Sequence, residues 1–486
     1  MTHVTSTSTA TSAHPPAAWV MLHLGLGSFH RAHQAAYLHA LRASGDTRWH
    51  LAGGNIRADM ADTVAALDAQ GGAYTLETIS PAGAHHYTRI TAIADVVPFE
   101  PTLSGLIARA AQASTRIISF TVTEAGYYLD GHDQLDANLP DIAADLAAAR
   151  GTQPMASGGS TIYGALTAML RARMQAQAGA VTLLNCDNLR HNGQRFRAGL
   201  LRFIALAGDA ALLDWVQAHT TCPNAMVDRI TPRPTPDVAA RVRAATGWID
   251  AVPVMGESFI QWVIEDRFCA GRPAWETVGV EMVESVAPYE EAKIRLLNAT
   301  HSCIAWAGTL VGYHFIHEGT HDAVIRRIAF DYATDDAIPV LSSPGAPSPV
   351  DLTRYRDVVL ERFGNPAIAD TNQRVAMDGY SKIPGFIAPT IQERLARGES
   401  IASVAMLPAL FLAYLQRWHA GQIAYTYQDQ VMDPRSAHAL CEAADPVAAF
   451  CADTVLWGTL AGDLRLTQSV RTAFERVTLF VRNHRT

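Results

Sequence analysis

A lysine, an asparagine and a histidine stand at positions 293, 298 and 301 of the chain, in the segment Pro288-Tyr-Glu-Glu-Ala-Lys-Ile-Arg-Leu-Leu-Asn-Ala-Thr-His301. An α-helix turns by about 100° per residue, so His301 and Asn298 would lie about 80° and 140° around the axis from Lys293, on one side of a helix. A lysine whose pKa is lowered by burial can take the proton of an alcohol, while amide and imidazole donors hold the oxygen as negative charge develops. The trio therefore suits oxidation of an alcohol without a metal. The alternative is an ordinary solvated helix face.

The lysine count favours the chemical interpretation. The chain has 38 Lys and Arg residues, and only Lys293 and Lys382 among them are lysine. Arginine serves as well as lysine for surface charge, but its guanidinium does not lose its proton in proteins. A general replacement by arginine would spare only positions that need a titrating amine or a compact donor. Both lysines are therefore candidates for a site.

A second amide, Asn188, ends the segment Asn185-Cys-Asp-Asn188, which follows a predicted strand at residues 181–186. Ligands of open α/β sheets bind at the carboxyl ends of the strands. Asn188 is thus either a further donor to the reacting oxygen or a loop cap.

A glycine turn follows the first apolar segment, Trp19 to Leu24, and reads Gly25-Leu-Gly27-Ser-Phe-His30. Strand, glycine turn and helix place backbone N–H groups against a pyrophosphate, although the third glycine of the usual dinucleotide pattern is His30 here. The same sequence also fits an ordinary tight turn. His30 and His33 suggest a metal pair, but no carboxylate or thiol is near in sequence, so core or phosphate-side histidines are favoured.

An acidic residue just past the second strand is expected to accept the hydroxyls of the adenosine ribose. Asp59, just past Gly53-Gly-Asn-Ile-Arg57, fits this position better than Asp46, which precedes the strand. Arg57 is the feature that would favour a 2′-phosphate instead. We expect NAD over NADP.

The sequence His317-Glu-Gly-Thr-His321 matches the H-E-x-x-H pattern of zinc hydrolases. Gly319 weakens the helix that such a site needs, and no third ligand is obvious. A zinc hydrolase is therefore a remote alternative.

Strand and helix signals alternate in the first part of the chain and become almost entirely helical after about residue 289. Strands are predicted at 19–24, 49–53, 116–123 and 181–186, and helices at 28–43, 59–70, 162–178, 290–309, 322–334, 351–363, 400–419 and 466–482. Alternation predicts an α/β fold, a Rossmann-like, mainly parallel sheet with helices on both faces, followed by a mostly α-helical domain. The expected divisions are a disordered tail at 1–17, a dinucleotide-binding domain at 18–287 and a substrate and catalytic domain at 288–486. Residues 342–349 are expected to form an exposed loop.

Composition excludes several classes of protein. The 486 residues are 49% hydrophobic and 17% charged with a net charge of −8, which argues against a disordered chain or a nucleic-acid-binding surface. The most apolar run, residues 404–415, is shorter than a membrane span and contains Pro408, so a core helix is expected. The six cysteines form no C-x-x-C pair and the N-terminus is no signal peptide, so reduced cysteines and a cytoplasmic location are expected.

The chain resembles the mannitol dehydrogenase family of polyol-specific long-chain dehydrogenases over nearly its whole length after the tail. The carriers of the resemblance are Gly25-Leu-Gly-Ser-Phe-His-Arg-Ala-His-Gln34, Thr121-Val-Thr-Glu-Ala-Gly-Tyr127, Asn185-Cys-Asp-Asn188, His191-Asn-Gly193, Met226-Val-Asp-Arg-Ile-Thr-Pro232, Pro288 to His301, Asn372-Gln-Arg374, and Asp378 to Ser381-Lys-Ile-Pro384. The missing third glycine is normal in this family. The acidic pair that the family places at the ribose is here Asp59-Met60, with one acid absent.

The resemblance assigns roles to these positions. It implies that Lys293 is the general base, that Asn298 and Asn188 hold the oxyanion, and that His301 orients the reacting hydroxyl. Polyol binding is implied for Asp228, Arg374 and Lys382, and proton exit from the lysine for Glu290. The residues implied for cofactor binding are Gly25, Gly27, Ser28, Phe29, His30, Arg31, Asp59 and Glu124.

The implied activity is a reversible, metal-independent, NAD-dependent oxidation of a polyol, with D-arabinitol to D-xylulose as the expected reaction. Oxidation of mannitol at carbon 2 and reduction of a hexuronate such as fructuronate are the alternatives within the family. A dinucleotide sensor without catalysis is the alternative outside it. The expected partner is a small polyol or ketose, with no nucleic acid and no membrane, and the oligomeric state stays open.

Overall fold

A computed structural model describes residues 19–131, 133–151, 161–342, 345 and 347–484. The chain folds into two compact units. The first contains the described residues of Met1–Glu77, Tyr87–Met255 and Ile260–Glu284; the second contains those of Thr78–His86, Gly256–Phe259 and Ser285–Thr486. The first unit is therefore not continuous in sequence, because two short segments belong to the second. The predicted tail at 1–17 lies outside the described residues.

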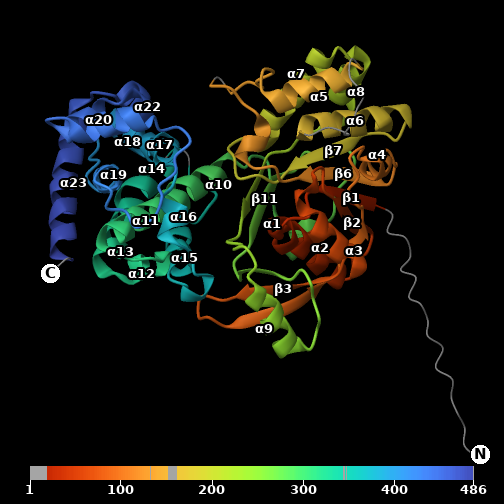
Figure 1. Cartoon of the computed structure of the whole chain (residues 1–486), viewed down its shortest axis with the longest axis horizontal. Coiled ribbons are helices and arrows are strands. Elements are labelled where there is room, and N and C mark those ends of the chain that lie inside the picture. Colours follow the sequence, from red (N-terminus) through yellow and green to blue (C-terminus); the bar gives the residue numbers. More distant parts are fainter. Residues whose placement is uncertain (1–18, 132, 152–160, 343–344, 346, 485–486) are drawn as a thin grey trace, which may run out of the picture. The chain divides into compact units, whose positions relative to one another are not determined.

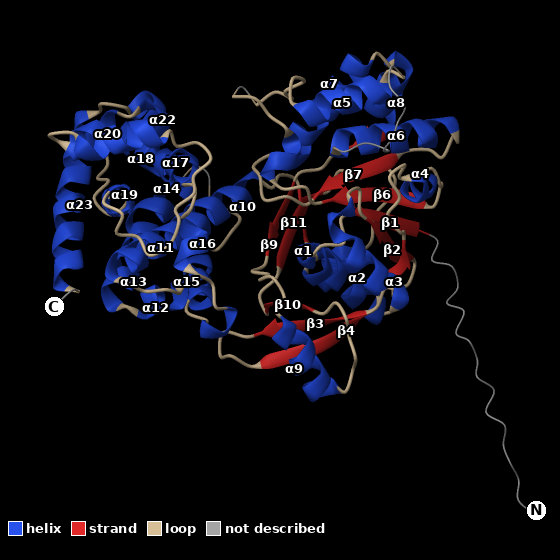
Figure 2. Ribbon diagram, in the orientation of Figure 1, coloured by secondary structure: helices blue, strands red, loops and turns tan. Residues whose placement is uncertain are grey.

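The first unit contains a six-stranded sheet in the order β5-β2-β1-β6-β7-β8, and the described pairs of neighbours are parallel (Figures 1 and 2). The strands are β1 (Trp19–Leu24), β2 (Trp49–Gly54), β5 (Ile93–Val96), β6 (Thr115–Phe120), β7 (Val181–Asn185) and β8 (Thr220–Thr221). This confirms the predicted Rossmann-like sheet. The strand order reverses between β1 and β6, because later strands are added on the other side of β1. In such sheets, ligands bind in the crevice at the carboxyl ends of the strands beside this point.

Helices cover both faces of this sheet, as Figure 1 shows. Val20, Leu22 and Leu24 pack with α4 (Ser104–Ala110), α5 (Pro140–Ala149), α6 (Ile162–Gln175), α7 (Asn192–Ala207) and α8 (Ala210–His219). Met21, between them in sequence, packs on the other face with α2 (Gln34–Ala43) and α3 (Ala61–Ala69). Successive side chains of a strand point to opposite faces, so a strand buried on both sides is apolar throughout.

Several element boundaries differ from the prediction. The helix expected from Ser28 is broken at His33, which has φ −120° and ψ −85°, into α1 (Ser28–Ala32) and α2. The helix expected at 59–70 begins as a 3₁₀ turn at Ala58–Met60, and the strand expected at 116–123 ends at Phe120. Two three-stranded sheets were missed. Their strands are β10 (Val254–Glu257), β3 (Tyr74–Ile79) and β4 (His85–Ile90), and β12 (Glu281–Val283), β11 (Gln261–Glu265) and β9 (Ala225–Asp228). Helices α4, α5, α7, α8 and α9 (Pro236–Thr246) were missed as well.

The second unit is built mainly of helices (Figure 2). They are α10 (Ala287–Ala292), α11 (Ala299–Val311), α12 (Ile316–His321), α13 (Ala323–Asp331), α14 (Ile338–Leu341), α15 (Leu352–Phe363), α16 (Asn372–Ala376), α17 (Gly379–Lys382), α18 (Ala388–Ala396), α19 (Met406–His419), α20 (Pro434–Glu442), α21 (Pro446–Ala452), α22 (Thr454–Trp457) and α23 (Leu464–Asn483). Three π-helical segments interrupt them: η4 (Lys293–Asn298), η5 (Tyr332–Ala337) and η7 (Ile383–Ile387). The mostly helical second part was predicted correctly.

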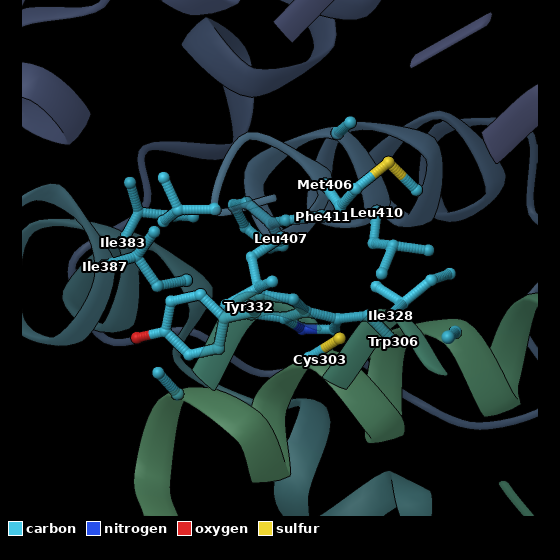
Figure 3. Packing of buried hydrophobic residues seen from close by; sticks show 14 of the residues in the cluster. Cys303, Trp306, Ile328, Tyr332, Ile383, Ile387, Met406, Leu407, Leu410 and Phe411 are labelled. Atoms are coloured by element: carbon cyan, nitrogen blue, oxygen red, sulfur yellow. The ribbon is translucent and has the colours of Figure 1, made fainter. Parts of the chain in front are cut away.

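The core of the second unit forms around α11 and α19. Cys303 and Trp306 on α11 pack against Leu407, Leu410 and neighbouring apolar side chains (Figure 3). Helix α19 contains most of the apolar run 404–415. Pro408 lies in its first turn, where a missing N–H leaves no helical hydrogen bond unmade.

The six cysteines form no disulfide. Among the described residues, no helix combines the length and apolar character that crossing a membrane requires. The loop expected at 342–349 includes residues 343, 344 and 346, which lie outside the described part of the chain.

Candidate functional site

Lys293 begins a π-helical segment, η4, between α10 and α11. The N–H of Ala299 donates to the carbonyl of Ile294, five residues earlier, instead of four. Residues five apart lie about 140° apart on an α-helix, but the wider π turn brings them closer to one face. The assumption of a regular α-helix was therefore wrong, and the π turn brings Asn298 closer to the face of Lys293 than predicted.

The packing around η4 holds this unusual turn. The Tyr332 hydroxyl donates to the Arg295 carbonyl at 2.8 Å, so a polar backbone group in the π segment has a buried partner. The Arg295 guanidinium lies 2.7 Å from carboxylate oxygens of both Glu291 and Glu393. These contacts join η4 to η5 and α18.

The residues expected to supply the base and its proton exit are both inside the protein. Lys293 and Glu290 are each only 5% exposed. Burial of an amine favours its uncharged form, which is the form that accepts a proton. The interpretation of this helix as a solvated face is therefore wrong for these two positions.

His301, on α11, is held by two residues that come from other helices or loops. Its ring stacks on Phe363 with 4.2 Å between ring centroids, and its Nε2 lies 3.3 Å from Oδ2 of Asp370. Burial lowers the pKa of His301, although the Asp370 carboxylate acts in the opposite direction. The imidazole is therefore neutral near pH 7.

A neutral imidazole that faces a carboxylate keeps its proton on the facing nitrogen, because two lone pairs would repel each other. This leaves Nδ1 of His301 as a hydrogen-bond acceptor, whereas the sequence suggested a donating imidazole. An acceptor orients a hydroxyl group by binding its hydrogen.

Asp370 is a residue that sequence reasoning missed, and it connects two that were predicted. Arg374 donates to both its carboxylate oxygens, Nε to Oδ1 at 2.6 Å and Nη2 to Oδ2 at 2.5 Å. Burial would raise the pKa of Asp370, but hydrogen bonds from His301 and Arg374 lower it below its usual range. Asp370 lies before Thr371, the N-cap residue of α16, so no helical spacing in the sequence pointed to it.

Lys382 belongs to the same neighbourhood. Its Nζ donates to the Val375 carbonyl at 2.6 Å, and the positive charges of Lys382 and Arg374 both disfavour protonation of His301. Beside Arg374 lies an open cleft of about 440 Å³. Its lining residues are Thr371, Gln373, Arg374, Met377, Asp378, Gln428 and Gln430. The second unit thus brings together His301, Arg374 and Lys382.

Replacing Asp370 by alanine is expected to lower kcat/KM for a polyol by about 10- to 100-fold, because His301 and Arg374 would lose the group that orients both. Steady-state kinetics with circular dichroism as a check of folding measures this. An unchanged kcat/KM in a folded Asp370→Ala variant would show that the Asp370 contacts play no part in the site.

In the first unit, the glycine turn follows strand β1 directly. Gly25 has φ +118°, which L side chains rarely adopt, and a Cβ added at Gly27 would meet nothing within 4 Å. Asn55, after β2, accepts the N–H of Leu26 at 2.8 Å and so fixes the turn. Asn55 was not among the predicted site residues.

Three residues on α1 that were predicted to bind the cofactor have side chains that contact other residues of the first unit. His30 is fully buried and stacks on His23 with centroids 3.4 Å apart, and burial lowers the pKa of His30 well below its usual value. The Arg31 guanidinium donates to the carbonyls of Leu26 at 3.1 Å and Val252 at 2.5 Å. Phe29 stacks on His33, 5.0 Å between centroids. The His30 and Arg31 side chains are buried, so a contact of these two residues with a cofactor would come from their backbone at the start of α1.

His30 and His33 are both fully buried. Nε2 of His33 lies 2.8 Å from the Gln261 carbonyl, and the part of the chain that the structure describes contains no group of three His, Cys, Asp or Glu residues placed to hold a metal.

The remaining first-unit candidates lie at strand ends. Asp59 is exposed in the 3₁₀ turn after β2, and Arg57 donates to the Tyr128 hydroxyl at 2.9 Å. Asn188 is exposed just past β7, while Asp228 is buried at the end of β9. Glu124 begins a 3₁₀ turn after β6, and its side chain lies outside the described part.

The H-E-x-x-H pattern has a structural explanation. Oε2 of Glu318 accepts the N–H groups of His314 at 2.8 Å and Phe315 at 2.7 Å, which caps α12. These backbone hydrogen bonds lower the pKa of Glu318, and the one from Phe315 has the largest effect. The carboxylate is therefore engaged in capping the helix, and no finding supports a zinc hydrolase.

Comparison with known proteins matches both parts of the chain to one family. The mannitol dehydrogenase Rossmann domain matches residues 20–277, and the mannitol dehydrogenase C-terminal domain matches residues 285–478. The chain is 61% identical over 460 residues to D-arabinitol 4-dehydrogenase of Ralstonia nicotianae, covering 94% of this chain and 96% of that protein. It is 55% identical to D-arabinitol 4-dehydrogenase of Klebsiella pneumoniae, covering 91% and 94%.

Among solved structures, Pseudomonas fluorescens mannitol 2-dehydrogenase in ternary complex with NAD and D-mannitol is 35% identical with a TM-score of 0.78, covering 96% of this chain and 94% of that one. The chain, with its Rossmann-like sheet, its helical second unit and its buried Lys293, belongs to the mannitol dehydrogenase family.

Proposed function

We propose that this protein is an NAD-dependent polyol dehydrogenase that oxidises D-arabinitol to D-xylulose and also catalyses the reverse reaction. The observation that supports this most is a lysine buried to 5% exposure at the start of a π turn that brings Asn298 toward its face. The similarity to two D-arabinitol 4-dehydrogenases favours arabinitol over mannitol, since the mannitol 2-dehydrogenases compared are only 34–38% identical.

The first unit has features that suit a dinucleotide. Gly25 at positive φ and the open space at Gly27 leave room for a pyrophosphate at the carboxyl end of β1, beside the point where the strand order reverses. The exposed Asp59 after β2 suits the ribose hydroxyls. When bound, NAD would supply the acceptor for the hydride that leaves the carbon of the alcohol.

The protein's own residues would handle the proton and the oxygen. The Lys293 amine takes the proton of the reacting hydroxyl, and Glu290, three residues earlier and equally buried, carries it away. The amides of Asn298 and Asn188 donate to the oxygen as its negative charge grows. Nδ1 of His301 orients the hydroxyl, while Asp228, Arg374 and Lys382 bind the rest of the polyol chain.

A substrate panel tests the proposal. We expect kcat/KM with NAD to be at least about tenfold higher for D-arabinitol than for mannitol, because polar groups of a site that stay unpaired with the wrong substrate are costly. The absorbance of NADH at 340 nm measures turnover, and fructuronate with NADH tests the reductase alternative. Repeating the assay with NADP, and with NAD in EDTA, tests cofactor preference and metal independence. NADH binding without turnover on any polyol would identify a sensor instead.

A further inference from the structure

Asp187 is a buried carboxylate to which the sequence assigned no role. It lies at the carboxyl end of β7, is 5% exposed, and directly precedes Asn188. Its Oδ1 accepts the N–H groups of Val122 at 2.8 Å and Thr123 at 2.9 Å, in the turn that follows β6. One carboxylate oxygen thus joins the ends of two neighbouring strands of the parallel sheet.

The turn that Asp187 holds has a strained backbone. Thr123 has φ 63° and ψ 171°, a region that is essentially restricted to glycine and is rarer still for a β-branched residue. Such a conformation persists only where the surroundings hold it, and such residues cluster at ligand-binding and active sites. Here the hydrogen bond from the Thr123 N–H to Asp187 holds Thr123 in this conformation.

A polar network fixes Asp187 itself. Its N–H donates to Oδ1 of Asn185 at 2.7 Å, its carbonyl accepts Nδ2 of Asn192 at 2.8 Å, and its Oδ2 lies 3.4 Å from the Tyr127 hydroxyl. Asn185 donates in turn to that hydroxyl. No lysine, arginine or histidine forms a salt bridge with Asp187 within the described ranges of the chain. Burial raises its pKa to about 6 despite the backbone hydrogen bonds.

We propose that Asp187 is a positioning residue that clamps the strained Thr123 turn to the end of β7 and so sets the cofactor-binding edge of the sheet. Glu124 follows Thr123 directly in the sequence, and Asn188 follows Asp187 directly. Strand β6, which the turn follows, borders the point where the strand order reverses, which is where a dinucleotide binds in such sheets. The link to catalysis rests on the proposed function, in which Asn188 holds the reacting oxygen.

The test compares Asp187→Ala, Asp187→Asn and a matched control, Asp145→Ala. Asp145 is also 5% exposed in the first unit, and its Oδ2 accepts the N–H and the hydroxyl of Thr161 at 2.8 and 2.7 Å. We expect Asp187→Ala to weaken NADH binding by about tenfold and to lower kcat by about tenfold, since a shift of 1 Å at reacting groups has effects of this order or larger. Asp187→Asn keeps an oxygen for both N–H groups and should stay within about threefold of the wild type. Asp145→Ala should lower Tm without changing the Kd of NADH.

A second variant tests the strain independently of whether Asp187→Ala folds. Glycine adopts positive φ without strain, so Thr123→Gly should raise Tm, and in the Asp187→Ala background it should restore much of the NADH affinity. Three results would each overturn the proposal. The first is that Asp187→Ala and Asp145→Ala have equal Kd and kcat. The second is that Asp187→Asn and Asp187→Ala change Kd and kcat equally, and the third is a lower Tm in Thr123→Gly. Fluorescence titration of NADH needs no polyol turnover. An inactive wild type that binds NADH would therefore refute the proposed function and leave the clamp to be decided by the titrations.

Discussion

Lys293→Ala is expected to lower kcat by about 10²- to 10⁴-fold while NADH binds with unchanged affinity, because general base catalysis contributes a factor of this size. The glycine turn and Asp59, which are proposed to bind the cofactor, lie in the first unit, and Lys293 lies in the second. Lys293→Arg should be almost as inactive, since a guanidinium does not give up its proton near neutral pH. Lys293→Met keeps most of the buried alkyl chain and separates lost packing from lost chemistry.

The measurement is NADH formation from D-arabinitol near pH 7, together with NADH titration of each variant by fluorescence. Arg327→Ala, which removes a side chain from an exposed ion pair with Asp331, is the control for a change of cationic charge in the same unit. A kcat in Lys293→Ala equal to that of the wild type would falsify the assignment of the base.

Glu257→Ala is expected to destabilise the second unit by about 3–5 kcal/mol, because it removes the carboxylate that neutralises the buried charge of Arg362. The two side chains are only 4% and 2% exposed, and Arg362 donates to both carboxylate oxygens, at 2.9 and 2.6 Å. The guanidinium also lies over the Phe259 ring, 4.0 Å from its centroid. The pair holds the segment Gly256–Phe259 against α15 within this unit.

Urea denaturation followed by circular dichroism gives the change in the free energy of unfolding. The exposed pair of Arg327 and Asp331 serves as the comparison, since exposed pairs contribute only about 0–1 kcal/mol. A double variant, Glu257→Met with Arg362→Leu, should be less destabilised than Glu257→Ala, because it leaves no unpaired charge. If Glu257→Ala costs no more than Arg327→Ala, the buried pair does not stabilise this unit.

Local patterns were sufficient for four strands of the parallel sheet, β1, β2, β6 and β7. The apolar segment before Gly25 and the glycine turn that follows it predicted strand β1 and the start of α1, because a short apolar run and the positive φ of glycine are local properties. The strand before Asn188 was found for the same reason. The short strands β9 to β12 were missed, since three to five residues carry too little pattern to separate them from loops.

The sequence also identified the residue types of the site, but it could not show their surroundings. His30 and Arg31 were expected near a cofactor, and the structure gives their side chains partners within the first unit. Asp370 was missed although it pairs with both His301 and Arg374. The contacts of Arg31 with Val252 and of Asp370 with His301 join residues far apart in the chain, and no local rule predicts them.

The sequence alone predicted the parallel sheet, the helical second part and the importance of Lys293. These features depend on the periodicity and chemistry of neighbouring residues. Only the tertiary structure decided that Lys293 begins a π turn, that Asp370 faces His301, and that Asp187 holds Thr123 at positive φ. The physical reason is that hydrogen-bond register and backbone strain depend on which distant groups pack against a segment, as Tyr332 does at the Arg295 carbonyl.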